Sequence, residues 1–153
     1  MIDEEVKEYI RKSVLCWLAT CDKELIPNVS PKEMFTYKDD NFILIADLAS
    51  PISFHNIKVN PHVCVSFIDI FVQKGFKVKG LAKIIKKSDP YFSLNLKFLT
   101  DLFTDKFPVK SIIEITVTNV ERIQAPSYFL YKDTTEKSQI ESALNTYKVA
   151  KYD

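Results

Sequence analysis

Glycine is scarce in this sequence: only Gly75 and Gly80 occur among its 153 residues. Glycine is the residue that lets a backbone approach a phosphate closely or make a strained strand-to-helix turn. Two isolated glycines cannot supply a dinucleotide-binding fingerprint, a P-loop or the nucleophile elbow of a hydrolase. Those three classes of enzyme are excluded.

Net charge and long apolar runs are also lacking. The formal net charge is +1, which provides no field to attract a nucleic acid or an acidic membrane. No apolar run reaches the roughly 18 residues of a transmembrane helix. The N-terminal segment MIDEEVKEYIRKS is charged and amphipathic, unlike a secretory signal. We therefore expect a cytoplasmic protein with neither nucleic acid nor membrane as a partner.

Cysteine and histidine are too few to suggest a metal site or a hydrolytic centre. Cys16, Cys21 and Cys64 are odd in number and lack metal-ligand spacing, and as members of apolar runs they are expected to be buried and unreactive. His55 and His62 have no triad context. No metal is predicted, and the catalytic residues remain unknown.

What the sequence does contain is a series of strand-like segments. Its length favours a single domain over 1–153. We expect strands over 14–20, 28–37, 42–47, 62–72, 76–85 and 109–123, and helices over 2–12, 51–60, 88 to about 105, and 137–150. Pro31 marks an edge strand or a bulge, and Trp17 is expected in the core. The fold class is mainly β with α insertions: a six-stranded antiparallel Greek-key barrel over about 12–123, with a C-terminal extension over 124–153.

The stretch IADLASPISFHNIKVNPHVCVSF, residues 45–67, combines a strand, a hydroxyl-rich turn and a helix start. Asp47, Ser50, Ser53 and Asn56 follow one another at intervals of three. A helix start offers free backbone N–H groups and partial positive charge, which favour a phosphate. Ordinary capping by Ser50, with Pro51 at the first helical position, explains the same residues. Both interpretations stay open.

Two further features have a structural and a functional interpretation. Lys79, within a strand, is either solvated or prevents pairing at a sheet edge, or it contacts a ligand. The turn at Gln73-Lys74-Gly75 is either a plain hairpin or a loop that presents side chains to a ligand.

Three segments in this order resemble the pyridoxamine-phosphate-oxidase-like family of split-barrel flavin-binding proteins: WLATCDKELIPNVSPK, ILIADLASPISFHNIKVNPHVCVSF and GFKVKGLAKI. The resemblance covers roughly residues 10–123. It implies a split barrel that forms a homodimer, with FMN in clefts between the subunits. It also implies an FMN-dependent oxidoreductase acting on an unidentified small molecule. A non-catalytic module that binds flavin, haem or a deazaflavin is the alternative, and a barrel whose cleft has lost its ligand is a third.

The resemblance also implies which residues contact the cofactor. The backbone of the second strand would follow the flavin ring, and the strand-to-helix turn would lie near the ribityl chain and phosphate. The implied cofactor-binding residues are Asn28, Val29, Ser30, Pro31, Lys32, Ala46, Asp47, Leu48, Ser50, Ser53, Asn56, Gln73, Lys74 and Lys79. Many family members have a basic pair after the serine, where this sequence has Pro51 and Ile52. Lys58, Lys74 or Lys79 would have to replace that charge, or FMN would bind weakly.

Overall fold

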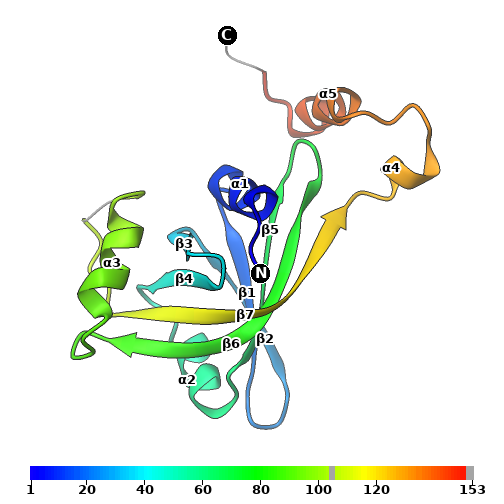
Figure 1. Ribbon diagram of the computed structural model, residues 1–153. Helices are drawn as coiled ribbons and strands as arrows, with labels where there is room; N and C mark the ends of the chain where they lie inside the picture. Colours follow the sequence, from blue (N-terminus) through cyan, green and yellow to red (C-terminus); the bar gives the residue numbers. More distant parts are fainter. Residues whose placement is uncertain (104–105, 151–153) are drawn as a thin grey trace.

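The computed structural model describes residues 1–103 and 106–150, and its chain forms one antiparallel sheet surrounded by helices (Figure 1). The strands are β1 (Cys16–Cys21), β2 (Pro27–Lys32), β3 (Phe35–Lys38), β4 (Phe42–Asp47), β5 (His62–Asp69), β6 (Lys74–Lys86) and β7 (Ser111–Gln124). The helices are α1 (Glu4–Lys12), α2 (Pro51–Val59), α3 (Phe92–Thr100), α4 (Ser127–Leu130) and α5 (Glu136–Tyr147).

The sheet has seven strands in the order β2-β1-β5-β6-β7-β4-β3, which corrects the prediction of six. The single strand expected over 28–37 is two strands, because the chain bends at Glu33 and Met34. β2 pairs with β1, and β3 pairs with β4. β2 and β3, which follow each other in the chain, therefore lie at opposite edges of the sheet. Two residues can join the edges only if the sheet curls on itself, as a barrel does. Pro31 lies in the edge strand β2, as predicted. The Greek-key arrangement itself stays a prediction.

Both glycines serve close backbone contacts within the sheet. A Cβ on Gly80 would lie 2.4 Å from the carbonyl oxygen of Thr116, next to an irregularity in the β6–β7 register. A Cβ on Gly75 would lie 2.1 Å from the carbonyl oxygen of Phe67. Gly75 is therefore a strand residue, and the positive φ in the preceding turn, 55°, belongs to Gln73.

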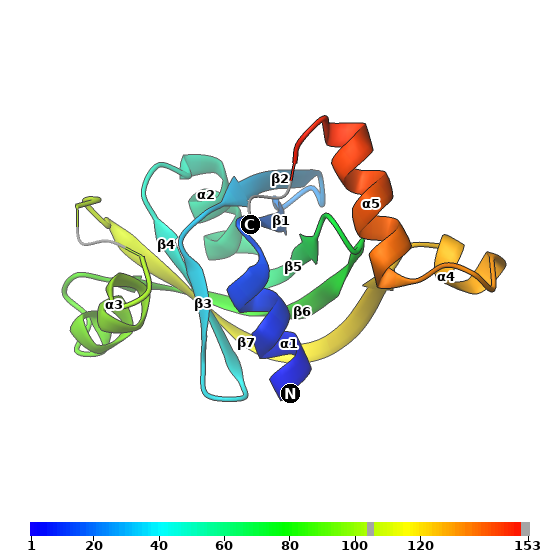
Figure 2. The ribbon, with the colours of Figure 1, turned by 90° about the horizontal axis from the view of Figure 1, so that it is seen from above.

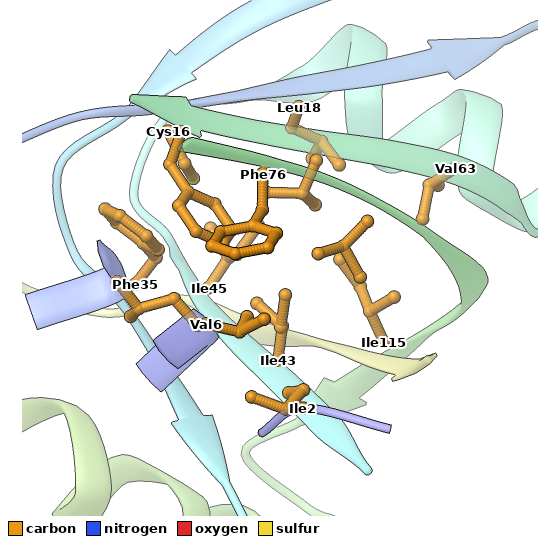
Figure 3. Close-up of a cluster of buried hydrophobic side chains, with 14 of the residues drawn as sticks. Ile2, Val6, Cys16, Leu18, Phe35, Ile43, Ile45, Val63, Phe76 and Ile115 are labelled. Atoms are coloured by element: carbon orange, nitrogen blue, oxygen red, sulfur yellow. The ribbon is translucent and has the colours of Figure 1, made fainter. Parts of the chain in front are cut away.

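The curved sheet encloses the main hydrophobic core, which includes Ile2, just before α1, and Val6 of α1 (Figure 3). Ile10 of α1 belongs to the same core. Trp17 is not part of this core. Its side chain is 45% exposed because β1 alternates, with Cys16 and Leu18 pointing inward. Cys16 is buried as expected, whereas Cys21 and Cys64 are only half-buried.

α3 lies beside one end of the long strands β6 and β7, and α4 lies beyond the other end of β7 (Figure 2). Asp3 caps α1, whose buried face packs against the interior. α3 covers a second apolar cluster that includes Leu44, Ile85 and Ile112. It begins at Phe92 rather than at residue 88, and it ends at Thr100, so the predicted helix was too long at both ends; residues 104 and 105 lie outside the described residues. No described helix is both long and apolar enough to cross a lipid bilayer.

Candidate functional site

A cavity of about 400 Å³ opens where β2, the turn from β4 into α2, and the segment before β7 meet. This volume lies within the range of small-molecule sites. Six of the predicted cofactor-binding residues line it: Ser30, Pro31, Lys32, Ala46, Leu48 and Ser50. The strand and the turn that the sequence singled out therefore face a common space.

Among the described residues that line this cavity, Lys32 alone has a cationic side chain. It is 7% exposed, and its ammonium donates hydrogen bonds to the hydroxyl oxygens of Ser30 and Ser50, the latter at 2.6 Å. Within the described part of the chain, no carboxylate forms an ion pair with it. Burial lowers the pKa of Lys32 below its ordinary value, and the neighbouring Asp47 carboxylate opposes this shift. The cavity thus holds a desolvated cation whose partners are neutral.

Asp47 organises the turn behind Lys32. One carboxylate oxygen accepts a hydrogen bond from the backbone N–H of Ser50 at 3.2 Å, and the other accepts one from the Ser111 hydroxyl at 2.8 Å. These bonds satisfy a buried carboxylate without Lys32.

Ser50 occupies the N-cap position of α2, as predicted, with Pro51 in the first turn. Its side chain makes no capping hydrogen bond to the helix and instead accepts from Lys32. Its hydroxyl therefore belongs to the cavity rather than to the helix end.

A second polar group, separate from the cavity, is joined through Thr20 of β1 and contains Ser53, Asn56 and Asn28. The Asn28 amide donates to the Ser53 hydroxyl at 3.4 Å and to the Thr20 hydroxyl at 3.3 Å. The Asn56 amide donates to the same Thr20 hydroxyl at 3.1 Å. These bonds tie α2 to β1 and β2. They hold the turn that carries Ser50, and none of these side chains lines the cavity within this chain.

The remaining predicted residues lie elsewhere on the subunit. Val29 is exposed on the outer face of β2. Lys79 pairs with Glu121 at 3.0 Å on the outer face of β6. Gln73 and Lys74 lie at the β5–β6 turn, where the Lys74 ammonium contacts Glu136 at 2.8 Å. A role for these four residues at a cofactor stays a prediction.

Sequence reasoning missed part of the lining. Leu15, Glu33, Met34, Ala49 and Phe107 complete the cavity wall. Phe107 comes from the segment before β7, far from the motifs in sequence, and no local pattern indicates its position. Lys58, one proposed charge replacement, lies over the Phe54 ring, 4.5 Å from its centroid. The cation inside the cavity is Lys32, which strand alternation could have indicated.

The described residues contain no cluster of three or more His, Cys, Asp or Glu side chains suited to a metal ion.

The fold agrees with the comparisons to known proteins. The pyridoxamine 5'-phosphate oxidase family model matches residues 2–124, and the chain belongs to this family. No curated protein matches.

Several solved structures share the fold. HupZ of Group A Streptococcus has a TM-score of 0.70 and 24% identity, covering 82% of this chain and 96% of that one. An FMN-binding protein from Syntrophomonas wolfei has a TM-score of 0.66 and 17% identity, with coverage of 80% and 89%. HutZ, the heme storage protein from Vibrio cholerae, has a TM-score of 0.62 and 20% identity, with coverage of 79% and 94%. At these identities the likeness shows the fold alone.

Proposed function

We propose that this chain binds FMN in the cavity around Lys32 and serves as an FMN-dependent oxidoreductase for a small molecule. One observation carries the proposal: a buried lysine with two hydroxyl partners, and no ion-pair partner among the described residues, lines the cavity of a chain from a flavin-binding fold family. The Asp47 carboxylate acts on this ammonium electrostatically but forms no ion pair with it among the described residues, and a phosphate would supply one.

The phosphate is assigned to the space beside Lys32, Ser30 and Ser50. Lys32 would contribute a charge-assisted hydrogen bond, and both serine hydroxyls can turn to donate to the anion. The start of α2 adds N–H groups without intrahelical partners, although Pro51 has none. Lys32 would thus replace the charge of the basic pair that many family members have at the positions of Pro51 and Ile52. This arrangement assigns the missing charge to β2 rather than to Lys58, Lys74 or Lys79.

The flavin ring is assigned to the apolar part of the same space. Pro31, Met34, Leu48 and Phe107 line it, and apolar contact favours a flat aromatic ring. Bound FMN would supply the transfer of electrons, and the protein would supply binding and orientation. No side chain is assigned as a proton donor or acceptor.

The homodimer follows from the resemblance and is part of the proposal. β1 and β2 carry exposed apolar side chains, including Trp17 and Val29. Large exposed apolar patches mark interaction sites. In such a dimer the partner would complete the cleft, and this is the setting in which Gln73, Lys74 and Lys79 would approach a cofactor.

The test is a titration of the purified protein with FMN, monitored by flavin fluorescence, together with mass spectrometry of any small molecule that copurifies. We expect saturable binding of FMN that is tighter than binding of riboflavin, because only FMN carries the phosphate. Oxidation of NADH or NADPH with an artificial acceptor would separate an oxidoreductase from a passive binder. Absence of FMN binding at micromolar concentration would contradict the proposal.

Haem is the second candidate, favoured by the likeness to HutZ. No histidine lines the Lys32 cavity, whereas His62 lines a separate hollow together with Cys21 and Cys64. Haem would therefore occupy a different part of the subunit from FMN. A Soret band on addition of haem, lost in His62→Ala, would support this function and disfavour FMN as the resident ligand.

A further inference from the structure

The C-terminal arm, residues 125–150, lies beyond the segment that matches the family model. Its first helix, α4, has no buried residue. Three consecutive large side chains at its end, the arm tip, are mostly exposed: Phe129 at 76%, Leu130 at 70% and Tyr131 at 66%. Consecutive apolar residues held in solvent are costly unless something covers them.

The arm tip is held away from its own subunit. The Tyr128 hydroxyl donates to the carbonyl oxygen of Val72 at 2.8 Å, and the Ala125 N–H donates to the carbonyl oxygen of Gln73 at 3.0 Å. These bonds fix the base of the arm at the β5–β6 turn. In both ribbon views α4 lies at the periphery, far from β1 (Figures 1 and 2).

An apolar groove of about 620 Å³, the Trp17 groove, lies beside β1 and the end of β5, next to α5, whose Tyr147 ring lies 6.4 Å from the Phe71 ring. It is lined by Val14, Leu15, Trp17, Ile68, Ile70 and Phe71, together with Lys12 and Asp69. Leu15 also lines the Lys32 cavity, so the two spaces adjoin. A group seated in the groove would therefore lie beside the proposed cofactor.

The groove and the base of the arm belong to one continuous apolar surface. Ile68 and Ile70 line both the Trp17 groove and a second hollow, which the base of the arm, through Ala125 and Pro126, helps to form. An isologous interface repeats every contact, so a two-fold axis that brought one arm to the partner's groove would bring the second arm to the other groove as well.

The charges beside the arm tip match those of the groove. Lys132 and Asp133 follow Tyr131, and the groove presents one acidic and one basic side chain, Asp69 and Lys12. The pairs Lys132 with Asp69 and Asp133 with Lys12 join opposite signs. Within its own subunit Lys12 pairs with Glu8 at 2.5 Å, and Asp69 accepts from the backbone N–H of Phe71 at 2.9 Å. The arm tip of a second copy would add a residue of opposite charge beside each of them.

From these observations we propose that two copies exchange arms, with the arm tip of each seated in the Trp17 groove of the other. The inference rests on the homodimer of the proposed function and adds the segment that makes its contacts. It also gives residues 125–150 a role: the partner's arm forms the rim of the cofactor cavity beside Leu15.

Trp17 is the only tryptophan, so its fluorescence reports directly on the groove. The experiment measures oligomeric state by sedimentation and Trp17 emission over a range of protein concentrations, without added flavin. It compares wild type with the double variant Phe129→Ser, Leu130→Ser. The matched control is Leu102→Ser, Phe103→Ser, which removes the same two residue types from another exposed site. Circular dichroism confirms that each variant is folded.

We expect wild type and control to form dimers in which Trp17 emits at shorter wavelength and is protected from acrylamide. The arm variant should dimerise at least tenfold more weakly, with Trp17 emitting at longer wavelength at the same concentration. A wild-type chain that stays monomeric would overturn both the arm exchange and the homodimer. A dimer whose stability and Trp17 emission do not respond to the arm variant would overturn the exchange alone. FMN titration of the same samples then tests the cofactor proposal separately.

Discussion

Replacing Lys32 with methionine tests the electrostatic basis of the site. The side chain is buried and similar in length to methionine, so the substitution removes a charge with little change of volume. A hydrogen bond to a charged group contributes about 1.5–3 kcal/mol, which corresponds to a loss of roughly 10- to 150-fold in affinity. We expect Lys32→Met to weaken FMN binding by that factor.

Riboflavin separates a phosphate contact from a general effect on the cavity. Because riboflavin lacks the phosphate, its affinity for Lys32→Met should stay within about twofold of wild type. The control Lys86→Met removes an exposed positive charge from β6 and should bind both ligands as wild type does. Melting temperatures without ligand should show no destabilisation in Lys32→Met, since a desolvated cation without a counter-ion is itself unfavourable. Equal losses of FMN and riboflavin affinity, or no loss of either, would refute the assignment of the phosphate to Lys32.

Three further predictions concern the same architecture. Ser50→Ala should weaken FMN binding but change the free energy of unfolding by less than about 0.5 kcal/mol, because Ser50 makes no capping hydrogen bond and a lost cap costs roughly 1 kcal/mol. Ser53→Ala should instead lower the free energy of unfolding, since Ser53 accepts a hydrogen bond from Asn28; urea unfolding measures both variants. Gly80→Ala should destabilise the fold by about 1–3 kcal/mol, because its Cβ would meet the Thr116 carbonyl at 2.4 Å, and an unchanged melting temperature would contradict this. The pKa of Lys32 lies below its ordinary 10.5 in the free protein, and a bound phosphate raises it again. FMN affinity should therefore fall as pH rises through the lowered pKa of Lys32 towards 10.5. The riboflavin affinity of wild type and the FMN affinity of Lys32→Met should not change over the same pH range.

Local patterns predicted most of the elements because each depends on nearby residues. The first helix follows from charged residues around an apolar face, and Pro51 and Asn60-Pro61 mark the limits of α2. The segment 28–37 was wrong as one strand because its two halves pair with different partners, β1 and β4, and pairing is a long-range property. Trp17 was misplaced for a similar reason: only the register of β1 decides which of its residues point inward.

The candidate site was predicted in part. The sequence brought Ser30, Lys32 and Ser50 into one hypothesis through their motifs, and the structure places all three on one cavity. It did not indicate that Lys32 would supply the missing cation, because this depends on the curvature that brings β2 against the turn after β4. Phe107 was beyond reach for the same reason, since it approaches from a distant segment.

The most direct test of the central claim is a crystal structure of the protein saturated with FMN. We expect the phosphate within hydrogen-bonding distance of the Lys32 ammonium and the Ser50 hydroxyl, with the flavin ring against Pro31 and Phe107. A phosphate bound elsewhere on the subunit, or a Lys32 cavity that holds only water under saturating FMN, would contradict it.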